Sequence, residues 1–259
     1  MQTKRTARLA AIAAVVIGVA CTMLGVTAEA KTPPAESAIR AAAKQNRYAF
    51  VTFFKSNDSA SKAMLADVKS IQGKYASRAN FVSVNVGDKA NRQVVSRYGA
   101  DRSPIPLTLV IAPNGAITGG FPREIDKSKL SSAFVSKGTA AVLKVMQDRK
   151  LAAICLQSSK TKHNKECLAT ARGIKSDSRL GGAVEIVKID SSDRSESKLL
   201  KQLGIVNSAN AQLVVMAPPG RTLGKFDGTV SKASVMASLM KSMNGGGCSG
   251  GSCGPGGCK

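Results

Sequence analysis

Three cysteines near the C-terminus are the residues of this chain that could do the most different kinds of chemistry. Cys248, Cys253 and Cys258 follow one another at intervals of five within the glycine-rich segment 244–259. Glycine at this density has too much backbone entropy to lose, so we expect a flexible tail. Its thiolates can hold a soft ion, Cu(I) or Zn(II), or form disulfides with another chain. The interval is not the two-residue gap of a zinc knuckle, and both hypotheses stay open.

A second pair of cysteines lies in the body of the chain. Cys155 falls within an apolar segment, and Cys167 lies on or near the helix expected to follow it. In an oxidising compartment they can form a disulfide if their Cα atoms lie within about 7 Å, and two buried free thiols are the alternative. His163, the only histidine, precedes Cys167 by four residues and would share its helix face. His163, Cys167 and Cys155 are therefore a candidate soft-metal site, to be weighed against a solvated loop histidine.

The N-terminal segment has the pattern of a secretory signal. Basic residues within 4–8 precede an apolar run over 10–26, and Ala28-Glu29-Ala30 has the small-x-small form of a cleavage site. We predict that residues 1–30 direct export to the periplasm, the cell envelope or the medium. Because Cys21 would leave with the signal, five cysteines remain, and an odd number cannot all pair within one chain.

The chain is strongly basic, with 38 Lys and Arg residues against 16 Asp and Glu and a net charge of +22. The bases are spread along the chain, and aromatic residues make up only 4%. A nucleic-acid groove clusters its basic residues and adds stacking aromatics, so this pattern argues against a nucleic-acid partner. It favours a solvated basic surface that associates with a protein or with an anionic envelope component.

An internal repeat indicates how these side chains are positioned. Residues 94–115 and 199–220 follow the same pattern of helix end, glycine, turn, apolar strand and tight turn, without a gap between the copies. An ungapped repeat of this length predicts a duplicated domain. With a boundary near Gly138, we predict one domain over 31–137 and a second over 138–243.

Periodicity and turn residues predict the same order of elements in both halves. In the first half, we expect helices over 36–46, 89–98 and 126–137, and strands over 48–54, 81–86, 107–112 and 116–121. Residues 56–59 should start a further helix that continues to about Tyr75. In the second half, we expect helices over 139–149, 163–174, 195–203 and 232–243, and strands over 151–157, 184–189, 213–217 and up to Phe226.

This order, with Ile-Pro before the third strand, resembles the thioredoxin fold. The resemblance rests on Phe50-Val-Thr-Phe-Phe54, on Tyr98-Gly-x5-Ile-Pro-Leu107 and on the Asn-Gly hairpin that follows. It covers 36–137 well and 139–243 more loosely. It implies an α/β architecture of two tandem thioredoxin-like domains, each a mixed sheet flanked by helices. It also implies a cis peptide bond before Pro106, with Pro104 as the rival position.

The resemblance locates an active-site position that lacks its sulfurs. The family's Cys-x-x-Cys lies at the start of the helix after the central strand, where the helix dipole stabilises a thiolate. This chain has Asp58-Ser59-Ala60-Ser61 there. A hydroxyl cannot exchange with a disulfide, so we expect no thioredoxin chemistry. Simple capping of the helix is one interpretation, and a peptide-binding surface without chemistry is the other.

The second half departs further from the family, because Ala211 stands where the first half has Pro106. The sequence thus predicts an exported, non-catalytic thioredoxin-like binding or scaffold protein. One alternative is a thiol–disulfide oxidoreductase that uses the tail cysteines, and another is a carrier of Cu(I) or Zn(II). A disulfide-linked oligomer through the tail would also agree with the pattern.

Overall fold

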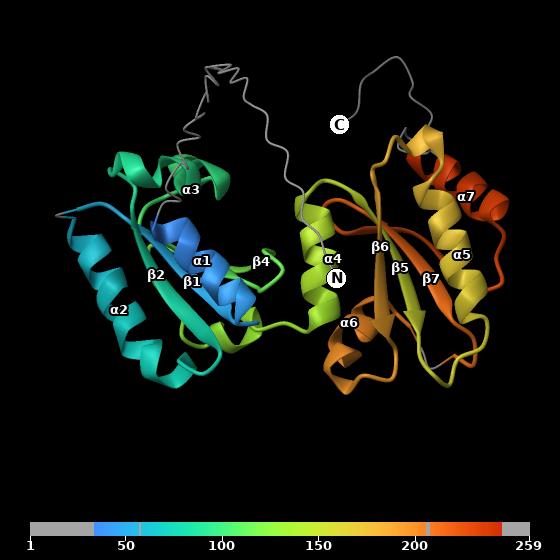
Figure 1. Ribbon diagram of the computed structural model, residues 1–259, viewed down its shortest axis with the longest axis horizontal. Helices are drawn as coiled ribbons and strands as arrows, with labels where there is room; N and C mark the ends of the chain where they lie inside the picture. The colour runs from blue at the N-terminus through green and yellow to red at the C-terminus, as the bar shows by residue number, and fades with distance from the viewer. Residues whose placement is uncertain (1–33, 57, 206–207, 245–259) are drawn as a thin grey trace, which may run out of the picture. The chain divides into compact units, whose positions relative to one another are not determined.

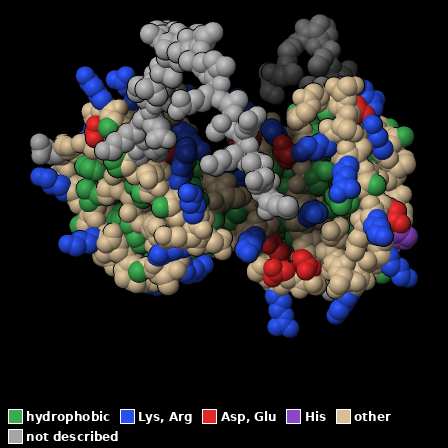
Figure 2. Space-filling model, viewed as in Figure 1, with side chains coloured by type: hydrophobic (Ala, Val, Ile, Leu, Met, Phe, Trp, Pro, Cys, Tyr) green, Lys and Arg blue, Asp and Glu red, His purple; other side chains and the backbone are tan. Residues whose placement is uncertain are grey.

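The computed structural model describes residues 34–244, except 57 and 206–207 (Figure 1). The predicted signal over 1–30 and the tail cysteines Cys248, Cys253 and Cys258 lie outside the described residues. Within the described ranges, no helix has both the length and the apolar character needed to cross a membrane. Basic side chains are scattered over the face shown in Figure 2 rather than gathered in one patch.

The first domain is built on a four-stranded mixed sheet with the order β2-β1-β3-β4. β1 and β2 are parallel, whereas β1 and β3 and then β3 and β4 are antiparallel. The strands are β1 (Tyr48–Phe54), β2 (Ala79–Asn85), β3 (Leu107–Ile111) and β4 (Ile117–Pro122). The helices are α1 (Pro34–Lys44), α2 (Ser59–Tyr75) and α3 (Arg92–Arg97).

The central strand β1 has helices on both of its faces, which explains its continuous apolar sequence. Val51 and Phe53 pack with residues of α1 and α3, while Phe50 packs with residues of α2 on the other face. Phe50 and Phe53 are fully buried. Burial of each such ring contributes about 2 kcal/mol to stability.

The second domain repeats this arrangement with the strand order β6-β5-β7-β8 and the same pattern of parallel and antiparallel pairs. Its strands are β5 (Leu151–Gln157), β6 (Val184–Asp190), β7 (Gln212–Ala217) and β8 (Arg221–Asp227). Its helices are α4 (Lys137–Gln147), α5 (Asn164–Lys175), α6 (Ser197–Gln202) and α7 (Lys232–Asn244). The predicted α/β architecture of two tandem domains is confirmed.

The prediction of a helix over 126–137 is wrong. A short 3₁₀ helix, Leu130–Ala133, occupies this segment instead. The carboxylate of Asp126 accepts hydrogen bonds from the amide and the hydroxyl of Ser128, at 3.0 and 2.5 Å, and so closes a local turn. Short polar side chains that bond the backbone in this way compete with helix formation.

Two carboxylates anchor helices of the second domain and make its stability depend on pH. Arg179 and then Lys232 hold the pKa of Asp177 below its ordinary value. Hydrogen bonds from Lys150 and Lys175 lower the pKa of Glu185 to about 2. Because both folded values lie below those of the unfolded chain, the stabilisation is complete above about pH 4.5 and is lost as the pH falls toward 2.

We therefore expect the thermal midpoint of the second domain to fall by several degrees between neutral pH and pH 2.5. Glu185→Gln should lower the midpoint at neutral pH and flatten this dependence, because the amide does not titrate. Calorimetry across the pH range measures both effects. A Glu185→Gln profile parallel to that of the wild type would show that this carboxylate is not a source of the pH dependence.

Candidate functional site

In the first domain, the segment Asp58–Ser61 forms a hydrogen-bonded helix cap at the start of α2. Asp58 Oδ2 accepts from the amide of Ser61 at 3.1 Å and from its hydroxyl at 2.7 Å. The Ser61 oxygen in turn accepts from the amide of Lys55 at 3.1 Å. Ser61 is buried, whereas Ser59 and Ala60 are exposed. The bond from the Ser61 hydroxyl is the main reason that the pKa of Asp58 is lowered.

Pro106 lies at the start of β3 in the same domain. The Ile105–Pro106 peptide bond is cis, while Pro104 follows a trans bond. Pro106 is buried, and its carbonyl accepts a hydrogen bond from the amide of Arg123 at 2.7 Å.

Near Pro106, apolar side chains fill the corner of the first domain at one end of β1, β2 and β3. Phe53 on β1 lies opposite Leu107 on β3, and both belong to one hydrophobic cluster. Val86, Tyr98 and Ile105 pack against the same cluster. The rings of Phe53 and Tyr98 have their centroids 6.3 Å apart. This corner is therefore closed by side-chain packing.

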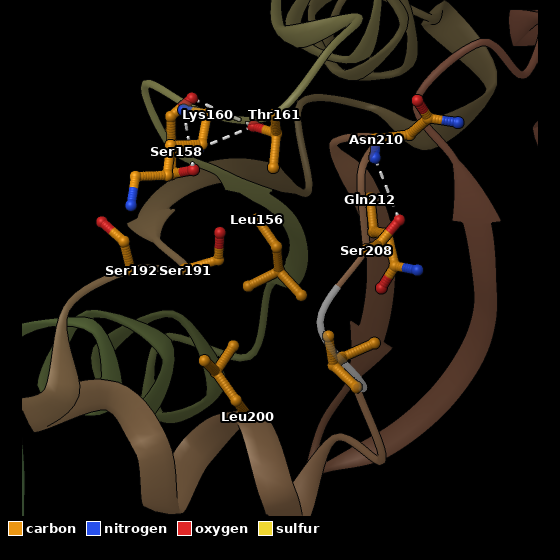
Figure 3. A pocket seen from close by; sticks show the side chains of 11 residues that line it. Leu156, Ser158, Lys160, Thr161, Ser191, Ser192, Leu200, Ser208, Asn210 and Gln212 are labelled. Atoms are coloured by element: carbon orange, nitrogen blue, oxygen red, sulfur yellow. Dashed lines mark hydrogen bonds between the residues drawn. The ribbon is translucent and has the colours of Figure 1, made fainter.

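The same corner of the second domain is hollow, and most of the residues that line it have polar side chains. The register of the sheets makes the correspondence plain, because Leu156 lies opposite Gln212 just as Phe53 lies opposite Leu107. The hollow has a volume of about 310 Å³, and we call it the polar pocket. It is lined by Leu156, Ser158, Lys160, Thr161, Ser191, Ser192, Leu200, Ile205, Ser208, Asn210 and Gln212 (Figure 3).

Comparison of the two repeats shows which residues differ at the pocket. Ser191 takes the place of Val86 just after the second strand of each sheet, and both amides bond the end of the first strand at 3.0 Å. At the repeat spacing, Asn210 and Gln212 correspond to Ile105 and Leu107. Single-sequence reasoning missed these residues, although the internal repeat carries the signal as polar residues aligned with apolar ones.

The loop over 158–164 forms one wall of the pocket, and hydrogen bonds within the loop fix its conformation. Thr161 Oγ1 accepts from the amide of Ser158 at 2.8 Å and donates to the Asn164 side chain at 2.7 Å. The Asn164 amide group then donates to the Ser158 carbonyl at 2.8 Å. Ser158, Lys160 and Thr161 of this loop line the pocket (Figure 3).

The loss of proline at position 211 has a direct structural consequence. The amide of Ala211 donates to the carbonyl of Lys162 at 2.8 Å, and the amide of Lys162 donates to Ala209 at 2.8 Å. Proline has no N–H group and cannot make the first of these bonds. In the second domain, the loop is therefore tied to the segment before β7, at the position where the first domain has Pro106.

Two amide oxygens near the pocket lack hydrogen-bond donors. Gln212 Oε1, on the pocket wall, and Gln157 Oε1, beside a neighbouring hollow, are buried without a partner in the described part of the chain. A buried acceptor without a donor is costly, so a ligand that supplies N–H groups would be stabilised here. Lys160 is the one charged residue among those that line the pocket.

In the second domain, Cys155 and Cys167 lie close together in the core, with Cys155 Sγ 4.0 Å from the carbonyl oxygen of Cys167. Both cysteines are fully buried and unpaired in this structure, and the disulfide between them stays a prediction. A hydrogen bond with Cys167, reinforced by burial, raises the pKa of Cys155. His163 is partly exposed, with Nδ1 3.7 Å from Glu166. No metal-binding cluster of three His, Cys, Asp or Glu side chains occurs among the residues described.

Comparisons with known proteins give only distant likenesses. No family model and no curated protein matches the sequence. Deadhead, the germline-specific thioredoxin of Drosophila melanogaster, is 22% identical with a TM-score of 0.31, over 37% of this chain and 86% of its own. The first two thioredoxin domains of Eps1p from Naumovozyma dairenensis are 10% identical with a TM-score of 0.31, over 82% of this chain and 97% of theirs. Those of Saccharomyces cerevisiae Eps1p are 9% identical with a TM-score of 0.28, over 76% and 94%.

The topology itself defines the architecture. In each domain, a parallel pair of strands is extended by an antiparallel hairpin on the other side of the first strand. In each domain, a long helix, α2 or α5, follows that first strand. The part of the chain that the structure describes therefore folds as two tandem domains of the thioredoxin fold.

Proposed function

We propose that this protein is an exported binding protein that performs no dithiol chemistry in its folded domains, and that the polar pocket holds an extended segment of a partner protein. The observation that carries the proposal is the pocket itself. The second domain has polar side chains and a hollow where the first domain is packed with apolar side chains. The signal pattern over 1–30 supports export.

The chemistry of the pocket suits a peptide main chain. Its polar residues are neutral hydroxyls and amides, apart from Lys160. An extended peptide presents alternating N–H and C=O groups, which such side chains can pair. Hollows on both sides share Ser158, Ile205, Ser208 or Gln212 with the pocket, so a bound segment could continue in either direction.

The position of each sulfur argues against catalysis by the folded domains. Ser61 has a hydroxyl where the family has its second cysteine, and that oxygen is already occupied in the helix cap. Cys155 and Cys167 are fully buried, and an inaccessible thiol is a poor nucleophile. An oxidoreductase or metal carrier would have to use the tail cysteines, which remain a prediction.

Replacement of the polar residues by their counterparts from the first domain tests the proposal. Full-length protein carrying Ser191→Val, Asn210→Ile and Gln212→Leu should bind peptides selected from a random displayed library at least about tenfold more weakly than the wild type. The new side chains fill the hollow and remove its hydrogen-bonding groups. Fluorescence anisotropy of labelled synthetic peptides gives the affinities.

Ser195→Val is the matched control, because this exposed serine lies outside the pocket. It should leave the affinities unchanged. Equal binding by the triple variant and the wild type would exclude the pocket as the peptide site. Failure to select any peptide that binds the wild-type second domain would overturn the proposal as a whole.

A further inference from the structure

We propose that the first domain has a separate site that binds a single oxyanion group, a phosphate or a carboxylate. The site is a cavity of about 260 Å³ between α1, the end of α3 and the β3–β4 hairpin. Three arginines, Arg40, Arg47 and Arg97, line it together with Glu36 and Asn114. It shares no residue with the polar pocket, so the inference does not depend on the proposed function.

The charge in this cavity is only partly balanced. Glu36 is buried and accepts from Arg40 Nε at 2.9 Å and from Arg97 Nη1 at 2.6 Å. One carboxylate and three guanidinium groups thus line the cavity, which leaves two positive charges in excess around it. Because the carboxylate also fixes two of the arginines in place, little conformational entropy remains to be lost when an anion binds.

Arg47 supplies the observation that points to a ligand. Its Nη2 donates to the carbonyl of Ala79 at 3.0 Å, which holds the guanidinium in position. Its Nε is buried and has no acceptor among the residues that the structure describes. A buried charged donor without an acceptor is costly, and a ligand oxygen would complete it. The planar fork of an arginine matches the oxygens of a carboxylate or a phosphate.

The second domain has the same fold but lacks this cluster of arginines at the equivalent positions. Each domain begins with a helix of 11 residues, so Glu36 and Arg40 on α1 correspond to Thr139 and Leu143 on α4. Lys150 directly precedes β5, as Arg47 precedes β1, and pairs with Glu185 at 2.7 Å. No excess of positive charge remains at these positions. The arginine-lined cavity is therefore a property of the first domain's own sequence.

Titration of the full-length protein with inorganic phosphate and, separately, with acetate tests the site and distinguishes the two anions. Amide NMR shifts should change at α1 and the β3–β4 hairpin for at least one of them. Arg47→Met keeps the apolar stem and removes the donors. It should weaken the binding of that anion by about tenfold or more. Arg47→Lys keeps the charge without the fork and should fall between Arg47→Met and the wild type.

The control is Arg102→Gln, which removes one charge from a side chain that is 84% exposed and does not line the cavity. It should bind the anion as the wild type does. Equal affinity in Arg47→Met and the wild type, equal losses in Arg47→Met and Arg102→Gln, or no binding of either anion at millimolar concentration would overturn the proposal. Thermal unfolding of each variant confirms that the protein is folded, and Arg47→Lys carries the test if Arg47→Met is not.

Discussion

Asp58→Cys with Ser61→Cys should give the first domain a disulfide-reducing activity about tenfold above the parent protein, in a background where Cys248, Cys253 and Cys258 are serine. The two side chains already touch, with 2.7 Å between the Ser61 hydroxyl and Asp58 Oδ2. They lie at the start of α2, a helix of 17 residues, where the helix dipole favours a thiolate. A fall in thiol pKa from about 8.5 to about 7 raises the thiolate fraction at pH 7 by about fifteenfold, somewhat more than the expected gain in activity.

Turnover of insulin with a small dithiol as reductant measures this gain. The matched control is Thr161→Cys with Asn164→Cys in the second domain, where the side chains also lie 2.7 Å apart. We expect little activity from this pair, because the bond between Ala211 and Lys162 ties its loop to the segment before β7. If the first-domain pair forms its disulfide but reduces no insulin, the first domain has lost more than its sulfurs.

Glu196→Ala should lower the free energy of unfolding of the second domain by about 3 kcal/mol. Glu196 is 4% exposed, and its carboxylate accepts from the amide of Gly138 at 2.7 Å and from the hydroxyl of Ser136 at 2.5 Å. It therefore satisfies donors at the start of α4 and complements the dipole of that helix. A Cβ on Gly138 would lie 2.6 Å from Glu196 Oε2, which shows how closely the two residues pack.

Urea unfolding followed by circular dichroism measures this loss. Glu196→Gln retains one acceptor oxygen and should lose less than the alanine variant. Glu166→Ala is the matched control, because its side chain is 59% exposed, and it should change stability by less than about 0.5 kcal/mol. A Glu196→Ala protein as stable as the Glu166→Ala control would show that water replaces the carboxylate at the helix start.

Local patterns in the sequence predicted most of the elements. The continuous apolar run that became β1 and the capping chemistry at Asp58 are both found in the structure. The internal repeat predicted two similar sheets, since equal spacing of apolar residues gives equal strand order. The failure over 126–137 has a local cause as well, because a side chain of the segment closes a turn that helix propensity does not describe.

The sites depended on contacts between residues that are far apart in the chain. Glu36 meets Arg97 across 61 positions, and Glu196 meets Gly138 across 58. The packing of separate helices and turns against one another decides such contacts, and sequence patterns within one helix do not encode it.

The sequence alone determined that Asp58–Ser61, the segment aligned with the family's Cys-x-x-Cys, contains no cysteine, since residue types are enough for that conclusion. Only the tertiary structure decided that Cys155 and Cys167 point into the core while His163 faces Glu166. It also showed that the second domain has the polar pocket at the corner where apolar side chains pack together in the first domain. The physical reason is that burial and cavities arise from the meeting of several elements, each of which looks ordinary by itself.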